Sequence, residues 1–194
     1  KFLLAPAHWP ATGSLTNMHF AGGGCRQLVT VAGSARARIG PEMSELAIIE
    51  NGAMLVRDGV IERIGSKTEI EPLIPSDCEV LDAAGRIVMP GFVDAHTHLV
   101  FAGNRSNELE MRSAGASYEQ IAAAGGGIMA TVRATRAASE EDLLTQSKRH
   151  SEWMLRTGTT TAEAKSGYGL TLEDELKVLR VIGRLDEESP LSLV

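Results

Sequence analysis

Two kinds of hydrophobic pattern divide the chain. Between about residues 27 and 89, short runs rich in β-branched residues are separated by turn residues, which is typical of strands. After about residue 117, apolar residues recur at helical spacing, and these segments alternate with short β-branched runs. Strand, helix, strand, helix and strand in this order are typical of a parallel sheet with helical crossovers. The patterns predict an antiparallel β unit followed by the first part of an α/β fold.

Residues 25–88 form the predicted antiparallel β unit. Asp58 and Gly59 between two apolar runs indicate a hairpin. The expected strands cover residues 27–32, 46–50, 53–56, 60–64, 79–82 and 87–89. Residues 1–24 show no periodicity and remain an unassigned extension, in which His8 and His19 are interpreted as incidental rather than as ligands.

Residues 89–194 contain the predicted β/α units. Ser139 and Thr171 precede acidic residues at the spacing of helix N-caps. The expected helices cover residues 117–124, 128–137, 140–156 and 172–189, and the expected later strands cover residues 159–164 and 191–194. The last helix carries an apolar stripe at helical spacing, and in this chain alone its first three members are expected to lack part of their partner surface: Leu172, Leu176, Leu179 and Ile182. The glycines at 125–127 lack the spacing of a phosphate-binding loop, so we expect a tight turn, with an anion cradle as the alternative.

The run at residues 87–100 predicts a buried strand, interrupted at Pro90 and Gly91, that ends in two histidines. Side chains alternate along a strand, so His96 and His98 should project to the same side. Two imidazoles at this spacing can hold neighbouring positions on one divalent ion. The alternative is a pair of hydrogen-bonded histidines at a strand end. His150 lies inside a predicted helix and is interpreted as solvated.

Composition narrows the class of protein. A net charge of −6 argues against a general nucleic-acid or membrane binder. Cys25 and Cys78 lack Cys-x-x-Cys spacing, which favours two unlinked thiols in a reducing compartment. No apolar run approaches the ~20 residues that span a bilayer. We therefore expect a soluble, cytoplasmic protein.

Candidate substrate-binding residues follow the predicted strands. Catalytic groups of a β/α barrel lie at the carboxyl ends of strands, so the loops at residues 99–105 and 165–169 should converge with the histidine pair. Arg105 could pair with a carboxylate in a bidentate manner; its alternative is a loop arginine paired with Glu108. Tyr168 lies between two glycines, and Tyr118 begins a helix; either ring could instead be packed structurally.

These motifs resemble a known family. The segments at residues 90–105, 125–128, 131–136 and 163–170 together resemble the imidazolonepropionases of the metal-dependent amidohydrolase superfamily, and the match runs from about residue 46 to 194. The resemblance implies an amidohydrolase-type (β/α)8 TIM barrel that uses one Zn or Fe ion. It implies that a metal-activated water attacks the ring amide of 4-imidazolone-5-propanoate and yields N-formimidoyl-L-glutamate in histidine degradation. Carried over by position, His96 and His98 would bind the metal, and Arg105, Tyr168 and Tyr118 the substrate.

The chain departs from this family in size. Members carry eight barrel strands, so the resemblance implies further metal ligands and the general acid/base residues beyond Val194. We therefore expect an incomplete barrel that is inactive and poorly stable alone. The alternatives are another cyclic-amide hydrolase, an aminohydrolase of the same superfamily, or an inactive remnant. The identity of the metal and the oligomeric state stay open, with a homodimer compatible with the resemblance.

Overall fold

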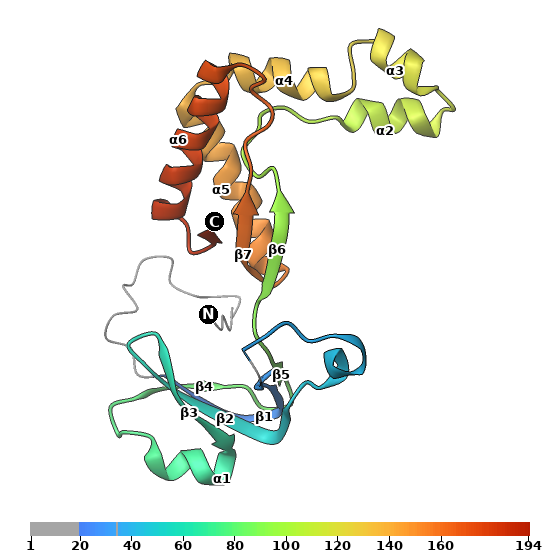
Figure 1. The fold of residues 1–194 in the computed structure, drawn as a ribbon. Helices are drawn as coiled ribbons and strands as arrows, with labels where there is room; N and C mark the ends of the chain where they lie inside the picture. The colour runs from blue at the N-terminus through green and yellow to red at the C-terminus, as the bar shows by residue number, and fades with distance from the viewer. Residues whose placement is uncertain (1–19, 34) are drawn as a thin grey trace. The chain divides into compact units, whose positions relative to one another are not determined.

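The computed structural model describes residues 20–33 and 35–194 and divides into two compact units, Lys1–Pro90 and Gly91–Val194 (Figure 1). Residues 1–19 of the extension predicted at residues 1–24, which include His8 and His19, lie outside the described residues. Residues 20–24 already belong to the first strand, which begins seven residues earlier than the predicted start at residue 27.

The first unit contains a mixed sheet. The strands are β1 (Phe20–Val29), β2 (Ile48–Arg57), β3 (Val60–Ser66), β4 (Glu79–Asp82) and β5 (Ile87–Val88), in the order β3-β2-β1-β4, with β5 also paired to β1. The pairs β1–β2 and β2–β3 are antiparallel, but β4 and β5 run parallel to β1. The prediction of an antiparallel unit is therefore wrong for β4 and β5. The chain reaches β4 from β3 through α1 (Lys67–Ile70) and the 3-10 turn η3 (Glu71–Leu73), whereas the 3-10 turn η2 (Gly40–Ser44) lies between β1 and β2.

The hairpin between β2 and β3 is confirmed. Asp58 and Gly59 have φ values of 51° and 74°, as the tight turn requires. Along β2, alternate residues enter two small cores on opposite faces of the sheet. Met54 packs with Cys25 and Leu28, whereas the neighbouring core contains Leu55. This unit thus has apolar packing on both faces of its sheet.

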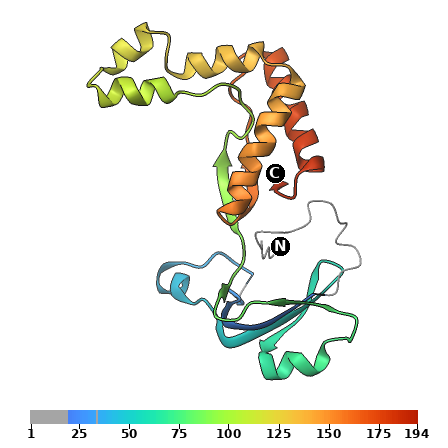
Figure 2. The same cartoon turned by 180° about the vertical axis from the view of Figure 1, so that it is seen from behind.

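The second unit contains a parallel sheet with helical crossovers. Its strands are β6 (Phe92–Thr97), β7 (Thr159–Ala164) and β8 (Ser192–Leu193), in the order β6-β7-β8. Its helices are α2 (Ser106–Ser113), α3 (Tyr118–Ala123), α4 (Ile128–Ala137), α5 (Glu140–Arg156) and α6 (Leu172–Glu188). Figures 1 and 2 show α5 and α6 packed beside the strands, while α2 and α3 extend away from them.

The predicted helix starts in this unit are confirmed. The Ser139 hydroxyl accepts the Asp142 backbone N–H at 3.1 Å, and the Thr171 hydroxyl accepts that of Asp174 at 3.2 Å. These caps satisfy backbone donors that have no partner within the helix. Helix α2 was not predicted, because its sequence is mostly polar and shows little apolar periodicity.

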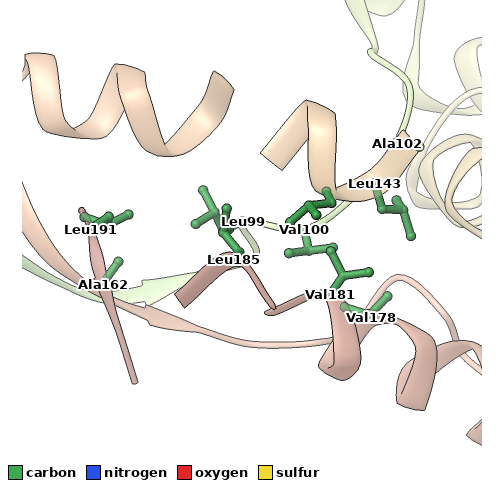
Figure 3. Packing of buried hydrophobic residues seen from close by; sticks show 10 residues of the cluster. Leu99, Val100, Ala102, Leu143, Ala162, Val178, Val181, Leu185 and Leu191 are labelled. Carbon is green, nitrogen blue, oxygen red and sulfur yellow. The ribbon is translucent and has the colours of Figure 1, made fainter. Parts of the chain in front are cut away.

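The core of the second unit lies between α5, α6 and the sheet (Figure 3). The face of α6 that enters it carries Val178, Val181 and Leu185, all fully buried. The first three members of the apolar stripe expected to lack partners lie outside this core and are 79%, 45% and 48% exposed: Leu172, Leu176 and Leu179. Both sets have helical spacing, so periodicity alone did not distinguish the packed face from the other.

The predicted strand at residues 87–100 is two strands in two different sheets. Pro90 and Gly91 separate β5 in the first unit from β6 in the second. A Cβ added at Gly91 would lie 2.2 Å from the Cγ2 atom of buried Thr160, so only glycine fits this point. The expectation of a buried strand is wrong for β6, where Val93 is 69% exposed, because among the described residues β6 pairs only with β7.

Candidate active site

The two histidines lie together at the carboxyl end of β6. The ring centroids of His96 and His98 are 5.5 Å apart, with the rings inclined at 72°. The Asp94 carboxylate accepts the His96 backbone N–H at 3.2 Å, which restrains the backbone between Asp94 and His96. His98 has a buried Nδ1 atom without a hydrogen-bond partner in the described part of the chain. Because buried polar groups are normally satisfied, this nitrogen does not fit the alternative of a hydrogen-bonded structural histidine.

The residues present fit part of a metal site. Two imidazoles match the ligand chemistry of zinc or iron, but a catalytic zinc ion normally has three protein ligands. Within residues 20–33 and 35–194, no group of three or more His, Cys, Asp or Glu side chains is placed to hold a metal ion. His96 and His98 can therefore supply two ligands, and further ligands must come from other residues.

The loop after β7 lies against the His98 ring. A Cβ added at Gly167 would lie 2.8 Å from His98 Cε1 and 3.0 Å from His98 Nδ1, so the absence of a side chain permits this approach. The next residue, Tyr168, has its ring centroid 5.3 Å from that of His98 and 5.8 Å from that of Phe101. The loop thereby places an aromatic ring and a phenol beside the second histidine.

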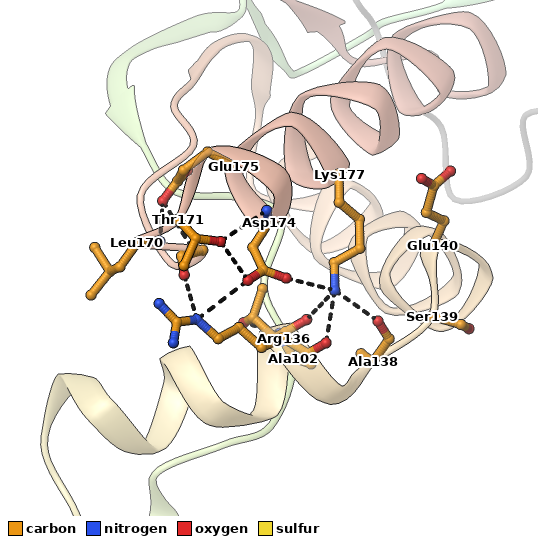
Figure 4. A network of polar contacts seen from close by, with 12 residues as sticks. Ala102, Arg136, Ala138, Ser139, Glu140, Leu170, Thr171, Asp174, Glu175 and Lys177 are labelled. Atoms are coloured by element: carbon orange, nitrogen blue, oxygen red, sulfur yellow. Dashed lines mark hydrogen bonds and ion pairs between the residues drawn. The ribbon is translucent and has the colours of Figure 1, made fainter.

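Polar side chains from α6 and α4 hold this loop in place (Figure 4). Glu175 accepts the backbone N–H groups of Gly169 at 2.9 Å and Leu170 at 2.7 Å. Burial raises the pKa of the Glu175 carboxyl, but these backbone hydrogen bonds and one from Ser166 outweigh it, so the pKa lies below its usual value. Arg136 donates from Nε to the Gly169 carbonyl at 2.6 Å. Sequence reasoning gave neither Glu175 nor Arg136 this role.

The same network joins α4 to α6. Lys177 donates from Nζ to the carbonyl oxygens of Thr135, Arg136 and Ala138 at 3.1, 2.9 and 3.2 Å. These carbonyls end α4 and have no partners within the helix. Asp174 forms ion pairs with Lys177 and Arg136, both at 3.4 Å. The polar network therefore fixes the end of α4 relative to the loop that carries Tyr168.

Arg105 lies at the start of α2 and pairs with Glu108. Its Nε donates to Glu108 Oε1 at 2.7 Å, and its Nη2 donates to Glu108 Oε2. The alternative predicted for Arg105 is thus present in the structure. The hydrogen bonds to Glu108 raise the pKa of the Arg105 guanidinium, with smaller electrostatic contributions from Tyr168 and Tyr118.

Tyr118 and His150 differ from the simplest predictions. The Tyr118 side chain is not in the core, because the residue is 67% exposed. His150 is not merely solvated: its Nδ1–H donates to the Leu99 carbonyl at 3.1 Å, and its ring stacks on Phe101 at a centroid distance of 4.8 Å. His150 supports the segment that follows His98, and the structure does not place it with the candidate ligands.

Comparison with known proteins identifies the family. The model of the amidohydrolase family matches residues 79–176, a segment that contains the histidine pair and the loop after β7. The chain belongs to the amidohydrolase family. This amidohydrolase chain is 55% identical over 170 residues to the imidazolonepropionase of Solibacter usitatus and 48% identical over 172 residues to that of Brevibacillus brevis. The matches cover 88% and 87% of this chain but 41% of each relative.

Two solved structures have a similar fold. Escherichia coli guanine deaminase matches with a TM-score of 0.56 and 19% identity, over 91% of this chain and 34% of the deaminase. An uncharacterized metal-dependent hydrolase from Pyrococcus horikoshii matches with a TM-score of 0.55 and 15% identity, over 91% and 47%. At such identities the likeness concerns the fold alone, and it confirms the predicted α/β class. Among the described residues, no helix is both long and apolar enough to cross a membrane.

Proposed function

We propose that this chain forms part of an imidazolonepropionase, which hydrolyses 4-imidazolone-5-propanoate to N-formimidoyl-L-glutamate. The observation that carries the proposal is the gathering of the histidine pair and Tyr168, with Arg105 at the start of α2, in a chain that is about half identical to relatives of that name. The strands β6, β7 and β8 would be the first three of a (β/α)8 barrel. The expected cytoplasmic location is retained as part of this proposal.

The two histidines would hold one divalent ion, zinc or iron. When bound, such an ion lowers the pKa of a coordinated water toward ~7 and so supplies a nucleophile at neutral pH. The Gly167 backbone lies close to the ring of His98, which directly follows β6. We take the remaining ligands and the general acid/base residues from outside the described residues, which offer no third ligand.

The substrate would lie between the metal ligands and the start of α2. Its propanoate carboxylate needs a cation with two parallel donors, which Arg105 supplies. Tyr168 lies beside His98, and we assign it to the part of the substrate between the ring and the carboxylate. Tyr118 is exposed, and its hydroxyl lies 3.9 Å from a Cβ built at Gly127, the residue whose N–H binds Glu108, so this hydroxyl would contact the substrate near Arg105.

Turnover by the full-length protein that contains this chain tests the proposal. The metal-loaded protein is assayed with 4-imidazolone-5-propanoate, hydantoin and guanine under the same conditions. We expect hydrolysis of the imidazolone at a kcat/KM at least 100-fold above that of the other two compounds. A higher kcat/KM with hydantoin or guanine would instead identify another cyclic-amide hydrolase or an aminohydrolase. No turnover of any of the three would favour the inactive remnant.

A further inference from the structure

The ion pair between Arg105 and Glu108 leaves one edge of the guanidinium free. A guanidinium has five N–H donors arranged in a planar fork. Glu108 accepts from Nε and from one hydrogen of Nη2, so among the described residues both hydrogens of Nη1 and the second hydrogen of Nη2 stay available. These atoms form the second edge, which can receive another carboxylate in a bidentate pair. The pairing with Glu108 is therefore compatible with substrate binding by Arg105.

Glu108 is itself held rigidly. Its Oε1 accepts the backbone N–H of Gly127 at 2.8 Å in a buried contact, and its side chain is 11% exposed, against 43% for Arg105. A Cβ added at Gly126 would lie 3.0 Å from this oxygen and 2.8 Å from Ile121 Cγ2. The glycines at residues 125–127 thus make the close turn predicted from the sequence, and the anion that their backbone binds is the carboxylate of Glu108.

We propose that Glu108 is a positioning residue that fixes the orientation of Arg105 so that the Nη1/Nη2 edge faces the substrate carboxylate. This role rests on the function proposed above. A buried carboxylate that is anchored by the Gly127 N–H restricts the guanidinium before the substrate arrives. The conformational entropy lost on binding is then smaller than for a mobile arginine. Glu108 would act through Arg105 and would not itself contact the substrate.

Ligand pairs that differ only in the carboxylate test this role. The metal-loaded full-length protein and its Glu108→Gln variant are titrated calorimetrically with imidazole-4-propanoate and with 4-propylimidazole, which lacks the carboxylate. We expect the variant to bind imidazole-4-propanoate at least 10-fold more weakly and 4-propylimidazole within twofold of wild type. In turnover, KM should rise at least 10-fold while kcat stays within threefold. Glu110→Gln, on the exposed side of the same helix, should behave as wild type.

Three results would overturn the role of Glu108. Unchanged or tighter binding of imidazole-4-propanoate by Glu108→Gln would show that the carboxylate is irrelevant or competes with the substrate. Equal weakening of both ligands would show a merely structural role. If the glutamine variant does not fold, Glu108→Asp keeps the charge but shortens the reach, and an unchanged KM in that variant would overturn the proposal. Wild-type protein that neither binds nor hydrolyses the propanoate compounds would instead refute the proposed function.

Discussion

Gly167→Ala tests whether the loop after β7 positions the His98 ring. An added Cβ would lie 2.8 Å from His98 Cε1, whereas carbon atoms in ordinary contact are about 3.5–4.0 Å apart. The ring or the loop must therefore shift by roughly 1 Å. Gly167 also has a φ of +150°, which L side chains rarely adopt. This backbone strain adds about 1–3 kcal/mol to the cost of the alanine.

We expect Gly167→Ala to weaken metal binding by about 10–100-fold, because displaced supports of a metal ligand cost affinity on this scale. Stability should also fall by about 1–3 kcal/mol from the backbone strain. The metal affinity of the full-length protein is measured by competition with a chelator, and the stability of the metal-free protein by urea unfolding.

A matched control lies in α6. A Cβ added at Gly183 meets no atom within 4 Å, so Gly183→Ala should leave metal affinity unchanged. It should also stabilise the protein by up to about 1 kcal/mol, because alanine is the better helix former. Metal affinity within twofold of wild type in Gly167→Ala would refute the reasoning that the loop holds the His98 ring.

Two further predictions concern polar contacts in the full-length protein. Lys177→Met removes the donations that complete the end of α4 and should cost about 1.5–3 kcal/mol, since the donor is charged. Lys148→Met loses one exposed ion pair with Glu188 and should cost less than about 1 kcal/mol; equal losses in urea unfolding would contradict this ranking. The hydrogen bond from the Arg105 guanidinium lowers the pKa of the Glu108 carboxyl. The ionised carboxylate of Glu108 therefore stabilises the folded state above the usual carboxyl pKa of about 4.3. This contribution is lost as the pH falls through the lowered pKa. The difference in Tm between wild type and Glu108→Gln should therefore be constant above about pH 5 and shrink below about pH 4, and a difference independent of pH would exclude the charge as its cause.

Local signals were sufficient for many elements of the fold. Asp58 and Gly59 specify their turn through backbone conformation alone, and Ser139 and Thr171 cap helices through residues three positions away. Such features depend on neighbours along the chain, so the sequence contains what is needed to predict them. The sequence also predicted an interruption at Gly91, but it did not predict that the two strands on either side belong to different sheets.

Features that depend on distant partners could not be predicted. The parallel pairing of β4 and β5 with β1 joins strands far apart in the chain, and either alignment satisfies the same apolar pattern. In α6, two apolar faces have equivalent spacing, and the buried one is selected by α5 and β7 rather than by α6 itself. The role of Glu175 depends on how the loop after β7 folds back onto α6.

The candidate site was predicted in part. His96 and His98 follow from a two-residue spacing, and the structure brings their rings together. The pairing of Arg105 with Glu108 was foreseen as the alternative to substrate binding, but the buried contact with Gly127 could not be. That contact joins residues 19 positions apart through the turn at residues 125–127. The glycines allow this turn but do not determine its geometry.

The most direct measurement is a metal titration of the full-length protein freed of metal by a chelator. Zinc or ferrous iron is added in sub-stoichiometric steps while hydrolysis of 4-imidazolone-5-propanoate is followed. We predict that activity rises linearly and reaches a plateau at one equivalent, and that His96→Ala and His98→Ala neither retain the ion nor recover activity. Full activity of the metal-free protein, or wild-type metal retention by both alanine variants, would contradict the assignment of these histidines as ligands.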